Sequence, residues 1–282
     1  MELTIQLILF ATIALVVLIA ILIAVVHKVK SQTVDRFLVK NPPKDTVILH
    51  QYGASPTVPS ISPYVIKLET YLKVAKIPYV NHYDRKPGPK GKLPWIQFNE
   101  HVIPDTHFII QFLNKKFHID LNKNLSREQL AIGHMARRTV EESLYWIMLT
   151  FRLVFEKCGT IYKKLGLPMF FIWYMRATAK GRLFSHGISR HSEDEVRQLM
   201  EDDLSAISAI LGQKRFLFGN SVEDVTEFDC AVFGQLCQMV WQMPDCHVED
   251  VIAGNFPNLV EYCTRMKTEF WADWEQRLLK QH

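Results

Sequence analysis

The stretch SISPYVIKLETYLKVAKIPY, residues 60–79, places a serine directly before an amphipathic helix. Ser62 is a favoured helix N-cap, and Pro63 suits the first helical position. A hydroxyl in this place can accept a hydrogen bond from a backbone N–H, or donate one to a thiolate outside the helix, where the helix dipole favours negative charge. No histidine lies near Ser62 in the sequence to act as its base. We therefore expect Ser62 to cap the helix, alone or while stabilising a thiolate, and to form no covalent intermediate.

Five cysteines offer a second kind of chemistry: Cys158, Cys230, Cys237, Cys246 and Cys263. Their number is odd and none forms a C-x-x-C pair, which indicates reduced thiols in a reducing compartment. Cys230 and Cys237 are seven residues apart and share a helix face, and paired thiolates would suit a soft ion such as Cd²⁺ or Zn²⁺. The spacing fits no closed metal site, however, and cysteine is often simply buried. We therefore expect structural thiols and no metal site.

The composition is that of an ordinary globular protein. The 282 residues are 48% apolar and 22% charged, with a net charge of +4, and they suffice for one large or two modest domains. Lysines and arginines are scattered along the chain, which does not favour nucleic-acid binding.

Residues 3–26 contain no charged side chain, and only Thr4, Gln6 and Thr12 interrupt the apolar run. A helix of this length spans the roughly 30 Å hydrocarbon core of a bilayer. A cleavable signal peptide would have a basic start, a shorter apolar run and small residues at a cleavage site. Here the chain begins Met-Glu and the run ends in VVHKVK, so we expect an uncleaved membrane anchor over residues 1–27.

The charges that flank this segment predict its orientation. The residues after it include Lys28, Lys30, Arg36, Lys40 and Lys44, whereas only the α-amino group and Glu2 precede it. The positive-inside rule then places residues 28 onward in the cytosol. Residues 28–45, which include a stiff Pro-Pro pair, are interpreted as a short linker.

The period of the apolar residues predicts two domains after the linker. Residues 46–52, 78–83, 94–98 and 101–103 are short segments typical of strands, with one helix after the first strand and one after the last. This βαβ-ββα order predicts an α/β domain over 46–120, in which a crossover makes the first two strands parallel.

Beyond residue 120 the pattern is helical throughout. Ser126, Ser192 and Thr226 each begin a capping box or a close variant, and the first of these helices extends to about residue 158. An aromatic-rich helix follows Pro168, and a last helix is expected from Pro257 to the C-terminus. We therefore predict an all-helical domain over 121–282, with no strand of five or more residues after 126.

Three segments, in this order, resemble glutathione S-transferase-like proteins and more closely the failed axon connections family: SPTVPSISPYVIKLETYLKVAKIPY, GKLPWIQFNEHVIPDTHFIIQFL and FLFGNSVEDVTEFDCAVFGQL. That family includes nematode cadmium-responsive lysosomal members with a hydrophobic N-terminal segment. The resemblance implies a thioredoxin-like domain packed on a helical domain, with a cis peptide before Pro94. A homodimer is a further expectation.

The resemblance also implies three contacts with glutathione. Ser62 matches the serine or cysteine that activates the thiol, and Leu93, before Pro94, matches the residue whose backbone pairs with the cysteinyl part. Asp105 and Thr106 match an acid-plus-hydroxyl pair at a helix N-terminus that binds the γ-glutamyl end. There, backbone N–H groups hold a carboxylate while the acid faces an ammonium group. Asp105 or Thr106 could equally serve only as a cap.

Two functions fit these features. The first is a membrane-anchored protein that binds glutathione, or conjugates it to a small electrophile, in detoxification or in the response to cadmium and other stress. The alternative is a noncatalytic module that recruits partners at a membrane, as do relatives of this fold in axon development or mitochondrial import. The retained Ser62, Asp105 and Thr106 favour the first. The resemblance also favours the lysosomal membrane, with the globular part in the cytosol.

The predicted orientation can be tested with the full-length protein in sealed vesicles whose cytosolic face points outward. We expect added protease to digest residues 28–282, because the basic flank keeps them on the cytosolic side. An immunoblot against a C-terminal epitope measures the digestion, with a lumenal protein as the protected control. Digestion that occurs only after detergent is added would contradict the orientation.

Overall fold

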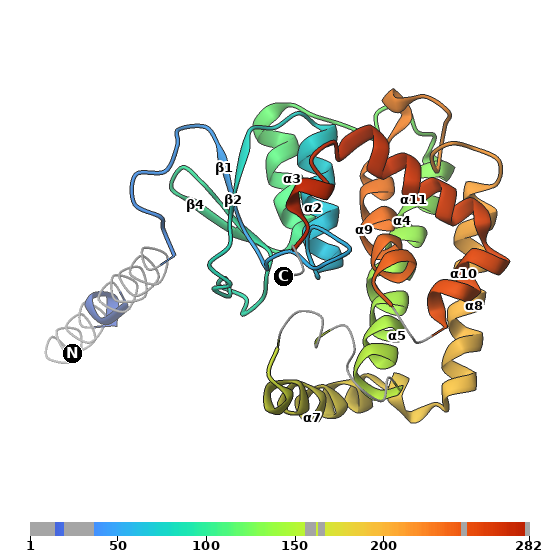
Figure 1. Cartoon of the computed structure of the whole chain (residues 1–282). Helices are drawn as coiled ribbons and strands as arrows, with labels where there is room; N and C mark the ends of the chain where they lie inside the picture. Colours follow the sequence, from blue (N-terminus) through green and yellow to red (C-terminus); the bar gives the residue numbers. More distant parts are fainter. Residues whose placement is uncertain (1–14, 20–36, 156–161, 163–166, 244–246, 280–282) are drawn as a thin grey trace, which may run out of the picture.

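The computed structural model describes residues 15–19, 37–155, 162, 167–243 and 247–279. Figure 1 shows a small sheet at one side of the molecule, a group of helices at the other, and α2 between the sheet and α9. The predicted anchor lies outside the described residues except for 15–19. Among the described residues, no helix has both the length and the apolar character needed to cross a bilayer.

Four strands form one mixed sheet in the order β2-β1-β3-β4. β1 (Val47–His50) pairs in parallel with β2 (Tyr79–His82) and antiparallel with β3 (Trp95–Phe98), and β3 pairs antiparallel with β4 (His101–Pro104). Every residue of β1 and β3 is buried, as expected for central strands. The predicted strands are confirmed to within two residues at each end.

Two helices cover this sheet. α2 (Pro63–Val74) connects β1 to β2, and α3 (Thr106–Phe117) follows β4. Leu68 and Leu72 of α2 and Leu113 of α3 are fully buried in one cluster with Leu49 and Ile96 of the central strands. The predicted βαβ-ββα order is therefore confirmed, because the apolar spacing that predicts each element also defines its buried face.

The rest of the described chain is helical, apart from an isolated bridge between Phe216 and Gly219. Its α-helices are α4 (Arg127–Arg138), α5 (Tyr145–Thr150), α7 (Met169–His186), α8 (Glu193–Leu211), α9 (Glu227–Trp241), α10 (Val248–Asn255) and α11 (Pro257–Phe270). The capping boxes at Ser126, Ser192 and Thr226 are all present. The described residues after 126 thus contain no strand of five or more residues, as predicted.

The helix predicted from 126 to about 158 is not regular. It passes from α4 into a π-helical segment, η1 (Thr139–Leu144), then into α5 and a second π-helical segment, η2 (Phe151–Phe155). π-Helical turns within α-helices are rare and occur frequently at functional sites. η1 carries Glu141, whose carboxylate takes part in the site described below.

The C-terminal part departs from the prediction in two ways. α10 was not predicted, because its N-cap, His247, forms no side-chain cap hydrogen bond and no capping signal marks its start. The expectation that the last helix extends to the C-terminus is wrong. α11 ends at Phe270, and a short 3₁₀ helix, η5 (Glu275–Arg277), follows. The chain leaves the helix there because residues 271–279 bind α2 instead.

α2 and α9 touch at the backbone. A Cβ atom on Gly234 of α9 would lie 2.6 Å from the carbonyl oxygen of Pro63 and 2.8 Å from the backbone N of Lys67. Any other residue at 234 would have to push the two helices apart, since both neighbouring atoms belong to backbone. Gly234 therefore sets how closely the helical part approaches the first turn of α2.

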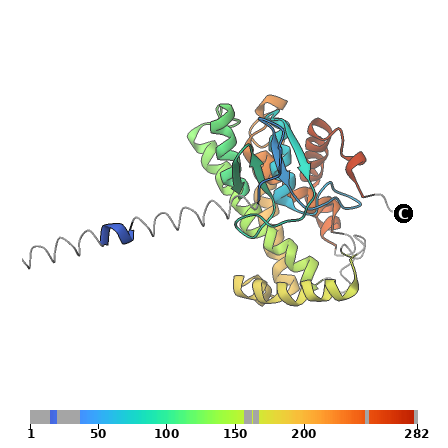
Figure 2. The ribbon, with the colours of Figure 1, turned by 90° about the vertical axis from the view of Figure 1, so that its left-hand side faces the viewer.

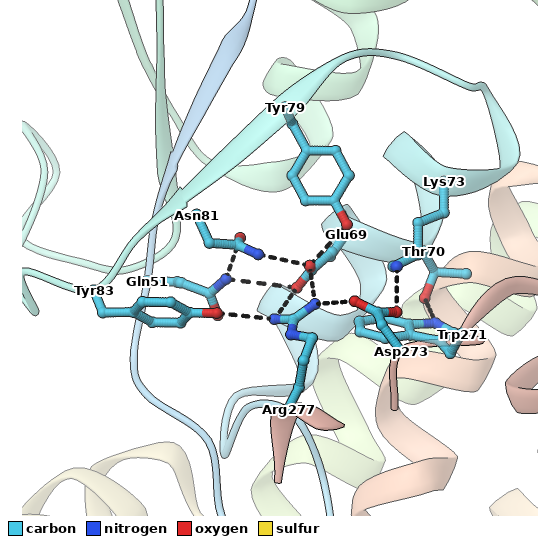
Figure 3. Close-up of polar contacts among 10 residues, drawn as sticks. All are labelled: Gln51, Glu69, Thr70, Lys73, Tyr79, Asn81, Tyr83, Trp271, Asp273 and Arg277. Atoms are coloured by element: carbon cyan, nitrogen blue, oxygen red, sulfur yellow. Dashed lines mark hydrogen bonds and ion pairs between the residues drawn. The ribbon is translucent and has the colours of Figure 1, made fainter. Parts of the chain in front are cut away.

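The C-terminal segment 271–279 binds the C-terminal half of α2 through a buried ion pair (Figure 3). The carboxylate of Glu69 on α2 is fully buried, and Arg277 binds both of its oxygens, with Nη2 3.0 Å from Oε2. Tyr79 and Asn81 of β2 also donate to this carboxylate, each at 2.9 Å. The pair therefore joins the segment 271–279, which we call the tail, to α2 and the sheet in one network.

Further contacts extend this network along α2. Lys73 pairs with Asp273 at 2.7 Å, and the indole N–H of Trp271 donates to the Thr70 hydroxyl at 3.0 Å. Beyond the ion pair, the backbone N–H of Leu279 donates to the Ser55 carbonyl at 2.9 Å. The tail thus binds both α2 and the loop that precedes it.

Replacing Arg277 by alanine should destabilise the protein strongly, because it leaves the Glu69 carboxylate buried without its cationic partner. We expect the free energy of unfolding to fall by about 3 kcal/mol, the usual cost of breaking a buried pair. Arg197→Ala on α8, which removes an i,i+4 pair with Glu193, is the matched control and should cost no more than about 0.5 kcal/mol. Urea denaturation followed by circular dichroism measures both. Equal stability of the two variants would show that the Glu69 pair does not hold the tail.

Candidate functional site

A cavity of about 740 Å³ lies between the sheet domain and the helices. All five residues that the sequence analysis proposed for the site line it: Ser62, Leu93, Pro94, Asp105 and Thr106. They come from three separate places in the chain, the start of α2, the residues before β3 and the start of α3. The fold brings them together on the wall that faces α5 and α7. Their proposed roles stay predictions.

Ser62 is the N-cap residue of α2, as predicted, but the predicted side-chain cap is wrong. Its hydroxyl forms no cap hydrogen bond. Pro63 has no N–H to donate, and the N–H of Val65 already donates to the Ser62 carbonyl oxygen at 3.1 Å. No described residue pairs with the Ser62 hydroxyl, which lies at the cavity wall beside the positive end of the helix dipole. The hydroxyl is therefore available to a ligand.

The Leu93–Pro94 peptide bond is cis, as the resemblance implies. Leu93 lies just before β3, and within the described part of the chain neither its N–H nor its carbonyl forms a backbone hydrogen bond. Backbone groups away from water are nearly always paired. The edge of the chain at Leu93 therefore offers both a donor and an acceptor to an extended ligand in the cavity.

Asp105 and Thr106 begin α3. Asp105 is the N-cap, with φ of 75°, and its carboxylate accepts a hydrogen bond from the His107 N–H at 3.0 Å. Its other oxygen lies 3.5 Å from Lys90 Nζ, a pair that is largely exposed. Capping and ligand contact are compatible here, because the second oxygen faces an exposed lysine that a ligand cation could replace.

A buried lysine that the sequence analysis missed organises this end of the cavity. Lys67 of α2 donates to the Thr106 hydroxyl at 3.1 Å and pairs with the Glu141 carboxylate at 2.5 Å. The Thr106 oxygen accepts a hydrogen bond from the Lys67 ammonium group, so the hydroxyl hydrogen of Thr106 can be donated to an anion. Lys67 lies among apolar residues of α2, and the local sequence pattern gives no signal that its ammonium group points to another helix.

The lining of the cavity carries more positive than negative charge. Six basic residues line it against three acidic ones: Lys90, Lys92, Arg137, Arg138, Arg152 and Arg182 against Asp105, Glu141 and Glu142. His107 does not add to the charge, because burial, Arg137 and Lys67 all lower the pKa of its ring. The cavity therefore favours an anionic ligand.

Tyrosines form another part of the wall. Tyr52, just after β1, and Tyr145 of α5 line the cavity, and burial raises the pKa of both phenols, so they stay protonated. Neither hydroxyl has a hydrogen-bond partner among the described residues, whereas Tyr64 donates to the Glu141 carbonyl at 2.9 Å. Tyr52 was missed, although a position at the carboxyl end of a strand in a parallel pair is a known signal for ligand contact.

The described cysteines do not line this cavity. Cys230, Cys237 and Cys263 are fully buried, and burial raises the pKa of each thiol. Cys158 and Cys246 lie outside the described residues. These three thiols are therefore neutral packing groups.

One cluster of potential metal ligands, at the ends of β1 and β2, was not anticipated. His50, His82 and Asp84 each offer a ligand atom within 4.8 Å of the others. His50 stacks on Trp95 and its Nδ1 lies 3.0 Å from the Asp84 carboxylate, while burial lowers its pKa. A neutral histidine that donates Nδ1–H to a carboxylate accounts for this arrangement, and the cluster lies outside the cavity.

Comparisons with known proteins identify the two halves of the fold. The glutathione S-transferase N-terminal domain matches residues 63–158, and the glutathione S-transferase C-terminal domain matches residues 200–266. A glutathione transferase family member from Pseudomonas fluorescens pf-5, crystallised with two glutathione molecules bound, superposes with a TM-score of 0.56 at 13% identity. The superposition covers 84% of this chain and 94% of that structure, which shows a shared fold.

Two relatives are similar in sequence. Failed axon connections from Drosophila melanogaster is 31% identical over 253 residues, which cover 83% of this chain and 60% of that protein. An isoprene-epoxide–glutathione S-transferase from Rhodococcus sp. (strain AD45) is 28% identical over 241 residues, which cover 78% of this chain and 98% of that protein. The chain therefore has the glutathione S-transferase fold, with regions that match the N-terminal and C-terminal domains of that fold, and it is similar in sequence to failed axon connections.

Proposed function

We propose that the protein binds glutathione in the cavity between its domains and presents the thiolate beside Ser62 to a small electrophile. The observation that carries this proposal is the convergence of unpaired polar groups on one positively charged cavity. The unpaired groups are the Ser62 hydroxyl and the backbone of Leu93, and the positive end of the α3 dipole lies on the same cavity. All three line the same cavity, which supports the binding of a short peptide that carries a thiol and a charged γ-glutamyl end.

At the γ-glutamyl end, two charges of opposite sign have to be held close together. The ligand carboxylate would accept from the N-terminal N–H groups of α3 and from the Thr106 hydroxyl, whose oxygen is already occupied by Lys67. The ligand ammonium would pair with the Asp105 carboxylate in place of Lys90. The charge-assisted hydrogen bonds at this end should therefore supply most of the affinity.

At the thiol, the requirement is to favour the charged form. A free cysteine thiol has a pKa of about 8.5, and a helix N-terminus with a hydroxyl donor lowers it. Ser62 would donate to the sulfur at the start of α2, and Tyr52 is a second donor on the same cavity. Ser62 remains a hydrogen-bond donor throughout and forms no bond to the electrophile. The thiolate is the nucleophile and the leaving group departs from the electrophile.

The apolar part of the cavity, formed by α5 and α7, would receive the electrophile. Met148, Leu149, Met175 and Leu183 line it. We further propose that residues 3–26 anchor the chain in an intracellular membrane, with the cavity on the cytosolic side. A role in detoxification or in the response to metals such as cadmium would follow from conjugation there, without a cysteine cage.

Two substitutions separate binding from activation. Asp105→Asn keeps the shape and the tolerance for positive φ but removes the charge, so we expect the Kd for glutathione to rise about tenfold. Ser62→Ala should leave that Kd within about twofold and lower kcat for conjugation at least tenfold, because it removes a donor that acts on the thiolate. Calorimetric titration and an electrophile-conjugation assay measure the two effects.

Ser205→Ala, at an exposed position of α8, is the control and should change neither quantity. Thermal unfolding checks that each variant is folded. If Ser62→Ala left a measurable conjugation activity unchanged, Ser62 would have no role beyond its place at the helix end. Glutathione binding with no conjugation of any electrophile tested would instead favour a noncatalytic role for the same cavity.

A further inference from the structure

Helix α7 has two apolar faces, and only one of them is packed. Ile172, Ala179 and Leu183 are buried against the helical domain. On the opposite side, Phe170 is 77% exposed and Trp173 76% exposed. Large aromatic side chains in such positions are unusual for a soluble surface.

The exposed aromatic residues form one stripe along the helix, which we call the aromatic face. It consists of Phe170, Trp173, Tyr174 and Phe184, and Tyr174 and Phe184 are 62% and 57% exposed. Their spacing places them on one side of α7 together with Ala177 and Gly181. A Cβ atom on Gly181 would meet no atom within 4 Å, so the middle of the face is open.

Both views of the ribbon show the same position for this helix. In Figure 1 α7 lies along the lower edge of the molecule, away from the sheet, and in Figure 2 it again forms the lower edge. The side of α7 that faces away from the domain is therefore uncovered by other described elements. Its inner side carries Met175 and Ala179, which line the cavity.

The sequence around α7 accounts for the net positive charge of the protein. Residues 157–192 contain seven of the 33 lysines and arginines and none of the 29 acidic residues. The segment therefore has a charge of +7, and the other 246 residues sum to −3. Such an acid-free segment complements an anionic surface.

Basic side chains of this segment also lie beside the aromatic face, where they could contact the same surface. Lys180 is exposed on α7 at one edge of the aromatic face, whereas Arg182, also exposed, lies toward the cavity. Arg190, just beyond the helix, stacks on Phe184 at 4.7 Å. An aromatic stripe bordered by Lys and Arg is typical of helices that lie in the interface of a membrane, with the rings among the headgroups and the cations at the phosphates.

We propose that α7 docks on the surface of a membrane that contains anionic phospholipids. The aromatic face enters the headgroup region, and Lys180 and Arg190 bind lipid phosphates. Tryptophan and tyrosine favour this depth of a bilayer, and basic side chains near the surface are attracted by its negative potential. Because the inner side of α7 lines the cavity, docking sets the cavity beside the membrane surface.

Tryptophan fluorescence can test this, because Trp173 is the one exposed member of the six tryptophans, all of which are described. The full-length chain is reconstituted in phosphatidylcholine vesicles with or without phosphatidylserine, with plain or brominated acyl chains. We expect bromine to quench part of the fluorescence in the phosphatidylserine vesicles. Trp173→Phe should remove that quenched part, since phenylalanine keeps the aromatic face but not the probe. If residues 3–26 do not insert into the vesicles, the chain in solution can still bind them through α7. Quenching of Trp173 by the brominated lipids then measures that binding in the same way.

Three variants that keep Trp173 define the contact. Phe170→Ser with Phe184→Ser should lower the docked-to-undocked ratio at least tenfold, and Lys180→Gln about fivefold. Leu130→Ser, at an exposed apolar position of α4, is the matched control and should change nothing. Circular dichroism confirms that each variant is folded.

Each alternative outcome overturns the proposal. Equal quenching of the wild type and Trp173→Phe would show that Trp173 does not meet lipid. Equal quenching with and without phosphatidylserine would show that charge has no part in the contact. A Trp173 that is shielded from iodide but not quenched by bromine would mean that another protein surface, such as a second copy of this chain, covers α7.

Discussion

The close contact of α2 with α9 is the constraint on which the site depends. At Gly234 the two backbones approach so closely that no Cβ atom fits between them. α2 carries Ser62 at its start and Lys67 one turn later, so the same contact fixes where both point. The tail grips α2 from a second side through Arg277 and Glu69. A helix that is held at both ends can present a hydroxyl to the cavity without a cap bond to hold it.

Lys67 connects α2 to the residues that line the cavity. A buried ammonium group is costly unless it is paired and hydrogen-bonded, and Glu141 and Thr106 meet that need. Its partners belong to η1 and α3, so one side chain joins three elements that line the cavity. The π-helical turn at η1 lies where the Glu141 carboxylate has to reach α2. The Lys67 ammonium group therefore holds α2, η1 and α3 together and also positions the Thr106 hydroxyl at the cavity.

The sequence predicted the elements well where the signal was local. Strand alternation, the capping boxes at Ser126 and Ser192 and the proline at the first position of α2 each depend on residues a few positions apart, and each is present in the structure. The convergence of Ser62, Leu93, Asp105 and Thr106 on one cavity followed from the family resemblance, since no local rule brings three distant segments together. The free hydroxyl of Ser62 was not predicted, because it depends on which N–H groups the first turn of α2 leaves unpaired.

The features that escaped prediction are non-local. Nothing near Lys67 or Glu69 in the sequence indicates a partner on another helix, and nothing near Phe270 indicates that the chain leaves its helix to bind α2. The central claim is that glutathione lies along the wall formed by α2, the Leu93 segment and α3. A crystal structure of the full-length protein with glutathione tests it most directly. The account predicts the γ-glutamyl ammonium beside the Asp105 carboxylate, the cysteinyl backbone paired with Leu93 and the sulfur within hydrogen-bonding distance of the Ser62 hydroxyl. Glutathione bound elsewhere, or an empty cavity at saturating ligand, would contradict it.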